Sequence, residues 1–210
     1  SSGVSVKQGN GPRDFGISIR GSNARNGFGV RNVVIMEDGF PVTQPDGLSR
    51  TDLTDPHAYG GIDVWRGPSS ALFGNYATGG AINFRTRTGG EINGVETGSD
   101  FGSFGYFSNY VAGGVKTGPY EAAVFLSDVR GDGFFEYSKF DTQTVNALLS
   151  YQAGSSDKIT VKVIDNQLDT ALPFRLSLNQ FNINPFQTGC ATSTVASRLA
   201  GCAASNFSSN

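Results

Sequence analysis

The chain has 210 residues, of which 29 are glycine, 11% aromatic and 16% charged, and its formal net charge is -2. Soluble domains carry about 25% charged residues, so this composition favours strands and turns. The Lys and Arg residues are scattered rather than clustered, so binding of nucleic acid is not expected. No apolar run approaches the roughly 18 residues that a transmembrane helix requires, which excludes a helical membrane protein.

The first part of the chain, to about Thr88, mixes strand, turn and helix signals. The apolar run Val33–Met36 is followed by the tight-turn pair Asp38-Gly39, and residues 40–42 are predicted to return as the second arm of a hairpin. Pro68 stands where the first turn of a helix tolerates proline, before a short apolar stretch. Gly79-Gly80 ends that helix and a strand over residues 81–84 follows. These elements predict a small α+β unit.

In the second part, after Gly89-Gly90, the character of the side chains alternates with period two, which predicts strands joined in a meander. The mean hydropathy of -0.21 agrees with such strands, because only alternate positions of a barrel strand must be apolar. Turn signals lie at 102–105, 117–119, 131–133 and 154–157. The five predicted strands cover residues 95–101, 106–115, 120–129, 142–152 and 159–169.

The third of these strands shows the two-faced pattern most clearly. One face carries Tyr120, Val124 and Leu126, and the other carries Glu121 and Ser127. Two interpretations remain open on this pattern: a membrane barrel with one face toward lipid, or an ordinary sheet with one solvated face. If the first strand runs outward, the short turns lie inside and the long segment from about residue 171 lies outside, as in membrane barrels.

Two cysteines, Cys190 and Cys202, lie close together near the end of the chain. A local disulfide is the preferred interpretation and fits an oxidising compartment, with two free thiols as the alternative. Metal ligation is not expected, because the single histidine, His57, is remote and there is no Cys-x-x-Cys pair.

Five motifs of the first part form an ordered series. Residues 3–6 resemble a Pro-Gly-Val-x-Val element, with Ser2 where proline is usual, and residues 17–21 resemble an Ile-Arg-Gly motif. Residues 34–42 resemble a Val-Asp-Gly-x-Pro hairpin. Residues 62–74 are similar to an Ile-Glu-Val-x-Arg-Gly-Pro run, and residues 79–84 close the series. In this order the motifs resemble the plug domain of TonB-dependent outer-membrane receptors, and residues 101–105 and 172–177 resemble the barrel part of these receptors more loosely.

The resemblance implies a mainly β protein: a small α+β plug domain followed by the start of an antiparallel transmembrane β-barrel. We therefore expect residues 1–89 to form a plug that lacks its N-terminus, and residues 90–210 to form the first barrel strands and extracellular loops. About five strands of a 22-stranded barrel would be present, so we expect the chain to be a fragment. A signal peptide and a TonB box are expected to lie upstream of it.

The resemblance also implies a function and a location. The protein is expected in the Gram-negative outer membrane, surrounded by lipid, where it binds a scarce nutrient and transports it into the periplasm with energy delivered through TonB. A ferric siderophore is the commonest cargo of the family, with cobalamin, haem, sugars or other metal complexes as rivals. A ligand-binding or envelope-assembly β protein without transport is the alternative hypothesis.

Two arginines match the plug arginines that barrel carboxylates hold in this family. These are Arg20 and Arg66, and their partners are expected in strands that the sequence does not contain. A guanidinium inside a barrel requires such charge-assisted partners to offset its desolvation. Asp63, where the family has glutamate, is a candidate partner for Arg66.

Ligand contacts in the family come from plug apices that face the outer vestibule. By position these apices are residues 8–11, 23–28 and 43–47. Within them, amide, carboxylate, guanidinium and aromatic groups would suit a polar chelate with some apolar surface. The candidate contacts are Gln8, Asn10, Arg25, Asn26, Phe28, Gln44 and Asp46.

An enzyme is not expected. His57 has no serine or cysteine nucleophile pattern around it, and the adjacent acids Glu37 and Asp38 are interpreted as turn residues. No cofactor is predicted.

Overall fold

The largest element of the structure, a computed structural model, is an antiparallel sheet of five strands that we call the wall sheet. The structure describes residues 2–8, 15–22, 30–49, 51, 55–171, 173 and 176–188. The wall strands are β7 (Gly94–Phe101), β8 (Phe107–Thr117), β9 (Tyr120–Gly131), β10 (Phe140–Gln152) and β11 (Lys158–Thr170). They confirm the predicted meander to within two residues at each end.

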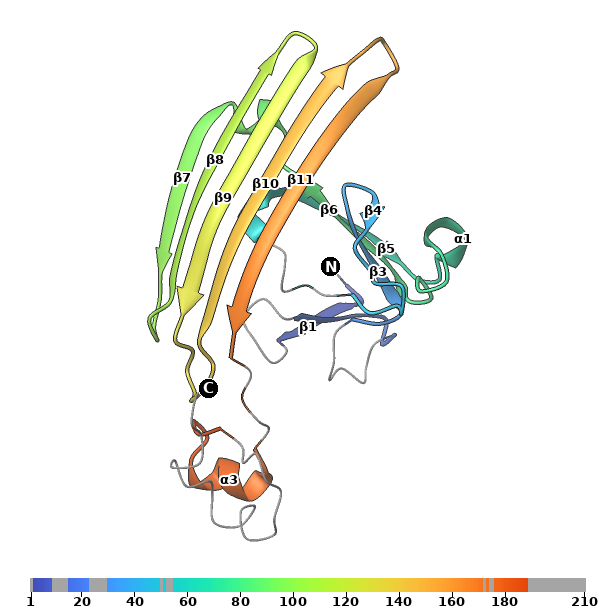
Figure 1. The fold of residues 1–210 in the computed structure, drawn as a ribbon. Helices are drawn as coiled ribbons and strands as arrows, with labels where there is room; N and C mark the ends of the chain where they lie inside the picture. The colour runs from blue at the N-terminus through green and yellow to red at the C-terminus, as the bar shows by residue number, and fades with distance from the viewer. Residues whose placement is uncertain are drawn as a thin grey trace.

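The wall sheet is continuous in register and its strands follow chain order (Figure 1). Twelve- and thirteen-residue strands such as β9 and β10 exceed the usual strand length of about 5 to 6 residues in globular proteins. Two connections are tight turns, at Gly118-Pro119 and at residues 153–157, where the Ala153 amide donates to the Asp157 carbonyl at 2.8 Å. The reversals near Gly102 and residues 132–139 lie at the opposite end, together with the segment after β11.

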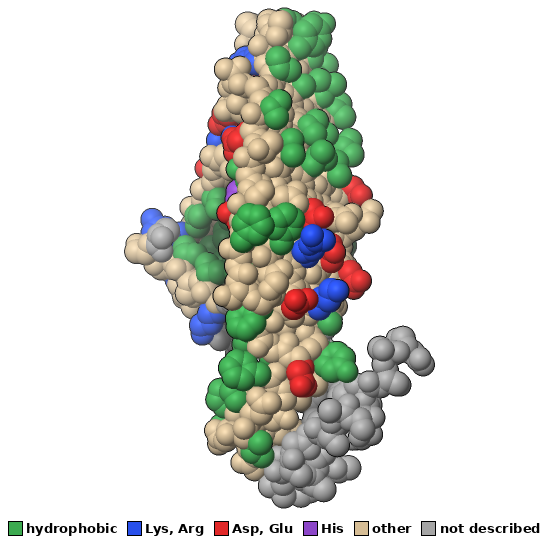
Figure 2. Space-filling model, turned by 90° about the vertical axis from the view of Figure 1, so that its left-hand side faces the viewer, with side chains coloured by type: hydrophobic (Ala, Val, Ile, Leu, Met, Phe, Trp, Pro, Cys, Tyr) green, Lys and Arg blue, Asp and Glu red, His purple; other side chains and the backbone are tan. Residues whose placement is uncertain are grey.

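The two faces of the wall sheet differ in chemistry, as the alternation in β9 predicts. Val124 and Leu126 are exposed on the outer face, whereas the inner face carries buried polar side chains such as Ser127 and Thr144. Figure 2 shows hydrophobic side chains gathered over one part of the outer face, with charged ones over another. The exposed apolar residues of the outer face include Val95, Val111, Val115, Tyr120, Val145, Leu149, Tyr151, Ile159, Val161 and Val163.

A second sheet, which we call the inner sheet, lies on the concave side of the wall sheet (Figure 1). Its order is β4-β3-β6-β5, with β3 parallel to β6 and the other pairs antiparallel. The strands are β3 (Val33–Glu37), β4 (Phe40–Pro41), β5 (Tyr59–Arg66) and β6 (Gly80–Thr86). The predicted hairpin at Asp38-Gly39 and the predicted strand after Gly79-Gly80 are confirmed.

A short hairpin, β1 (Val4–Gln8) with β2 (Phe15–Ile19), completes the first part of the chain. It packs on the inner sheet through Ile17 and Ile19, which join Val33 and Ile35 in one buried cluster. The cluster contains only aliphatic side chains among its buried members, so it is held by the hydrophobic effect rather than by polar contacts.

Four short helices lie in the connections of the described ranges. The 3-10 helix η1 (Pro56–Ala58) precedes β5, and α1 (Ser70–Phe73) follows the proline that predicts its start. The helix α2 (Gly89–Ile92) joins the inner sheet to the wall sheet, and α3 (Leu178–Ile183) follows β11; the sequence signals predict neither. In the part of the chain that the structure describes, no helix is both long and apolar enough to cross a membrane.

Gly89 of α2 shows how closely this connecting helix approaches the wall sheet. A Cβ atom at this position would collide with the backbone carbonyl oxygens of Ala122 and Val115, which belong to two wall strands. Backbone atoms of a sheet cannot move aside as a flexible side chain can, so the position requires glycine. The junction between the sheets is therefore fixed by a close backbone contact.

Replacing Gly89 by alanine should destabilise the junction by about 1 to 3 kcal/mol, the usual cost of overpacking. Gly113, on the outer face of β8, is the control, because a Cβ atom added there would meet no other atom within 4 Å. Denaturant unfolding of the full-length protein in lipid vesicles measures both variants. Equal stability of Gly89→Ala and Gly113→Ala would contradict the close contact.

Candidate functional site: the interface between the two sheets

Lys162 on the inner face of β11 makes the longest-range polar contact between the two sheets. Its ammonium donates to Glu37 Oε1 at 2.7 Å, to Thr86 Oγ1 at 2.5 Å, and to the Asp38 carboxylate. Asn146 Nδ2 of β10 adds a donor to Glu37 Oε1 at 3.4 Å. One wall cation thus lies between two carboxylates at the β3–β4 turn and a hydroxyl at the end of β6.

The environment of Asp38 favours its ionised form. Burial alone would raise the pKa of this carboxyl, but hydrogen bonds from Lys162 and from the side chain and amide of Thr86 outweigh burial and hold the pKa below its ordinary value. The Thr86 bonds measure 2.8 Å from the amide and 2.7 Å from the hydroxyl. Nearby, burial and then the charge of Glu37 raise the pKa of Tyr59. The turn therefore presents negative charge to the wall.

Asp55 forms a second contact between the sheets. Its side chain is fully buried, and it accepts a hydrogen bond from Ser127 Oγ of β9 at 2.6 Å. It also caps η1 by accepting from the His57 amide at 3.0 Å, and it lies 3.2 Å from His57 Nδ1. The His57 ring stacks on Tyr110 of β8 with 4.5 Å between the ring centroids. These contacts fix η1 against the wall.

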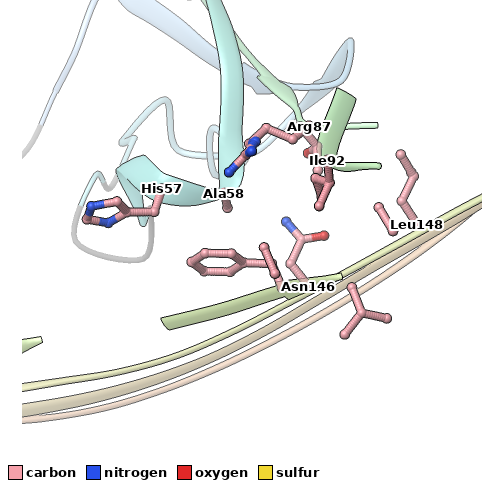
Figure 3. A pocket seen from close by; sticks show the side chains of 11 residues that line it. His57, Ala58, Arg87, Ile92, Asn146 and Leu148 are labelled. Atoms are coloured by element: carbon pink, nitrogen blue, oxygen red, sulfur yellow. The ribbon is translucent and has the colours of Figure 1, made fainter. Parts of the chain in front are cut away.

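The space beside His57 and Ala58 shows how tightly the sheets are packed. Figure 3 shows Arg87 and Ile92 on one side of this gap and Asn146 and Leu148 of the wall on the other. Its volume is about 10 Å³, which is about the space that one water molecule requires. The interface at this point has no room for a ligand.

A wider groove of about 870 Å³ lies between the β3–β4 turn and strands β10 and β11. Phe40 and Val42 of the inner sheet line one side, and Leu148 and Ile164 of the wall line the other. Lys162 borders this groove as well. The two sheets are therefore tightly packed near η1 and farther apart near the β3–β4 turn.

Arg87, which follows β6, pairs with Glu96 of β7. Its two terminal nitrogens donate to the two carboxylate oxygens at 3.1 and 2.6 Å, and Tyr110 donates to Glu96 Oε1 at 2.8 Å. The bond to Glu96 raises the pKa of Arg87. A two-pronged pair of this kind is stronger and more directional than a single ion pair.

Replacing Arg87 by methionine should weaken the junction between β6 and β7, because Glu96 would keep only the Tyr110 donor. The β6 amides are expected to exchange faster in this variant, because the lost pair is two-pronged. Arg85→Met is the control: Arg85 pairs locally with Glu91 at 2.8 Å, and both side chains are more than 40% exposed. Hydrogen exchange of the β6 amides measures the difference. Equal exchange in both variants would contradict a special role for Arg87.

Comparison with known families identifies the first part of the chain. Residues 1–81 match the family model described as "TonB-dependent Receptor Plug Domain". These residues are the plug domain of a TonB-dependent receptor. The motif-based identification is therefore confirmed, and the inner sheet, with the β1–β2 hairpin, is the core of the plug.

A known relative supports the same conclusion. The ferrienterobactin receptor of Escherichia coli (strain K12) is 33% identical over 90 residues, an alignment that covers 36% of this chain and 12% of that protein. The chain thus matches only a small part of the length of this relative.

Solved structures match both the plug and the wall sheet. The unliganded ferric citrate transporter FecA superposes with a TM-score of 0.68 at 21% identity, over 89% of this chain and 30% of that one. The FrpB iron transporter from Neisseria meningitidis gives 0.62 at 22% identity, over 79% and 28%. The copper transporter OprC gives 0.64 at 16% identity, over 82% and 27%. The chain has the fold of a plug followed by the start of a barrel, and it spans less than a third of these proteins.

The proteins that the chain resembles are transport receptors, not enzymes. The arrangement around Asp55 agrees, because the carboxylate lies between Ser127 and His57 and so separates them, whereas a catalytic triad places the histidine between the other two. Among the described residues, no group of three or more His, Cys, Asp or Glu side chains could hold a metal ion.

Both plug arginines singled out from the sequence, Arg20 and Arg66, are exposed. Arg66 Nη1 donates to the Ser2 carbonyl at 2.9 Å, and Arg20 is exposed beside Gly67. Asp63 accepts from Asn83 Nδ2 at 3.3 Å, so Asp63 and Arg66 have different partners rather than each other. The role of both arginines as contacts to other barrel strands stays a prediction.

The candidate ligand residues are only partly described. Gln44 and Asp46 are exposed in the loop after β4, where Asp46 Oδ1 accepts from the Leu48 amide at 3.0 Å. Gln8 ends β1, and nothing is described of its side chain. The remaining candidates, Asn10, Arg25, Asn26 and Phe28, lie outside the described residues, and so do Cys190 and Cys202.

The residues that join plug and wall were not predicted from the sequence. Glu37 and Asp38 are turn residues, as interpreted, but they also bind Lys162. One signal was available: Lys162 places a charge between Thr160 and Ile164 on the inward face of β11. A charge at an inward position of a barrel strand faces the polar interior, where the plug lies.

Proposed function

We propose that the full protein is an outer-membrane receptor that binds a ferric siderophore or a related metal chelate and transports it into the periplasm. The observation that carries this proposal is the docking of the plug on the inner face of the wall sheet through Lys162, Asp55 and Arg87. A plug held by polar contacts inside a barrel closes the pore, and it can be displaced when these contacts break.

The apolar outer face of the wall supports a position in the lipid bilayer. Val124, Val145 and Val161 are exposed there, as expected for side chains that contact lipid. The protein would lie in the outer membrane of a Gram-negative cell, with the tight turns at Gly118-Pro119 and residues 153–157 in the periplasm. TonB would act through a segment upstream of residue 1.

The names of the relatives favour iron as the cargo. They are a ferrienterobactin receptor, a ferric citrate transporter and an iron transporter, whereas OprC is a copper transporter. Residues of the plug apices would contact the chelate. Gln44 and Asp46 are exposed in one apex, and Gln8, Asn10, Arg25, Asn26 and Phe28 belong to the other two by position.

Three further features belong to this proposal. We propose that the plug ends near residue 89, that the barrel strands and loops continue to residue 210, and that Cys190 and Cys202 form a disulfide in the long loop after β11. Arg20 and Arg66 would contact carboxylates on barrel strands outside this chain. An intact-mass increase of two hydrogens on reduction tests the disulfide, and labelling of both thiols without reductant would contradict it.

Membrane fractionation combined with ligand binding tests the proposed function. The full-length protein should sediment with outer membranes and, in detergent, bind ferric catecholate or ferric citrate in preference to the copper chelate. Binding of copper alone would contradict iron as the cargo. A protein that partitions into the aqueous phase would contradict the receptor and favour the ligand-binding module without transport.

A further inference from the structure

The Lys162 cluster has an unusual charge balance for a contact between two parts of a protein. Two adjacent carboxylates, those of Glu37 and Asp38, share one ammonium. Consecutive strand residues normally point to opposite faces, but Asp38 has φ 50°, and this turn conformation lets both carboxylates reach the same cation. Without Lys162 the turn would carry two like charges side by side.

The cluster is partly rather than fully buried. The exposed fractions of the side chains are 16% for Lys162, 11% for Glu37 and 23% for Asp38. Charges that stay partly exposed keep part of their hydration and are screened by water, so such a pair holds less tightly than a fully buried one. Such a contact suits a reversible attachment.

A second lysine of the same strand shows that this is not a general property of inward lysines. Lys158 lies four residues earlier on the same face of β11, and it pairs with Glu121 of β9 at 3.5 Å. Its partner belongs to the wall, whereas both acidic partners of Lys162 belong to the plug. Within the described residues, Lys162 is the lysine that connects β11 to the plug through ion pairs.

We propose that Lys162, Glu37 and Asp38 form a charge latch that holds the β3–β4 side of the plug against β11 and that opens when the plug moves. The holding role follows from the structure, and the opening rests on the proposed transport function. The polarity is the reverse of that expected for Arg20 and Arg66, because here the plug supplies the anions and the wall supplies the cation. The latch borders the groove between the turn and β10–β11, so its opening would widen that groove.

Hydrogen exchange in the full-length receptor tests the holding role. Lys162→Met should speed exchange of the amides at the β3–β4 turn and at the end of β6 by about tenfold or more, because two carboxylates lose their cation. Lys158→Met is the matched control and should leave these amides unchanged. Lys162→Arg keeps the positive charge, so these amides should stay largely protected from exchange. This variant replaces Lys162→Met in the test if the methionine variant does not fold.

The triple variant Glu37→Gln, Asp38→Asn, Lys162→Met separates charge from packing. It removes all three charges, so exchange should return toward that of the wild type. Exchange as fast as in Lys162→Met alone would overturn the charge latch, and so would equal exchange in the Lys162→Met and Lys158→Met variants.

The permeability of the outer membrane tests the charge latch in cells, and this test does not depend on whether the receptor transports a chelate. Cells with the Lys162→Met receptor should admit a large antibiotic that the outer membrane normally excludes, and cells with Lys158→Met should not. Equal sensitivity of the two would contradict the holding role. If the wild type transports no chelate while both latch results hold, the transport proposal fails and the latch remains as a static contact.

Discussion

Replacing Asp55 by alanine should lower the free energy of local unfolding at η1 and β5 by about 3 kcal/mol. The carboxylate is fully buried, and it accepts from Ser127 across the interface and from the His57 amide within η1. Truncation leaves these donors without the Asp55 acceptor, and Ser127 is itself buried. Hydrogen exchange of the β5 amides in the detergent-solubilised full-length receptor gives this free energy.

Asp46→Ala is the matched control for that experiment. Asp46 also accepts from an amide two residues onward, that of Leu48, but it is exposed and lies in the loop after β4. Its replacement should cost less than about 1 kcal/mol, the usual value of a local cap. If both variants lose the same stability, the contact to Ser127 does not hold the plug.

If the outer face contacts lipid as proposed, replacing Val124 by arginine should destabilise the barrel by about 2 to 4 kcal/mol, the cost of a cation on the lipid-facing side near the middle of the bilayer. Val124 is exposed on the outer face of β9, and its neighbours across the strands are Gly113 and Ala147. Neither of them offers a counter-charge. The amount of folded receptor in outer membranes and its unfolding in lipid vesicles measure the effect.

Gln143→Arg is the control with a neighbouring counter-charge. Gln143 is exposed on the same outer face, but its neighbour on β9 is Asp128, so an arginine there would find a carboxylate. It should be tolerated. If Val124→Arg and Gln143→Arg reduce the amount of folded receptor equally, the result would contradict an apolar band that contacts lipid. If both variants fold as well as the wild type, a solvated outer face would be favoured.

Most of the fold could be predicted from the sequence because its signals are local. The period-two alternation of β7 to β11 and the turn residues between them depend only on neighbouring positions. Asp38-Gly39 and Pro68 likewise mark a turn and a helix start by their own backbone preferences. The helix α3 was missed, although its cap is local: Ser177 Oγ accepts from the Gln180 amide at 3.3 Å.

The candidate site could not be predicted in the same way, because it depends on docking over long sequence distances. Lys162 lies 125 residues from Glu37, and Ser127 lies 72 residues from Asp55. Alternation shows that Lys162 and Ser127 point inward, but the part of the plug that each contacts depends on how the plug docks on the wall sheet. The family motifs instead predict contacts for Arg20 and Arg66, whose expected partners lie on barrel strands outside this chain.

Uptake of radioactive iron tests the central claim most directly. The full-length gene is expressed in iron-starved Gram-negative cells that lack their own receptors, with and without a functional TonB protein, and ferric catecholate and ferric citrate are supplied separately. The account predicts accumulation of iron from at least one chelate when TonB is present, and surface binding without accumulation when it is absent. Accumulation that does not depend on TonB, or none from any iron chelate, would contradict it.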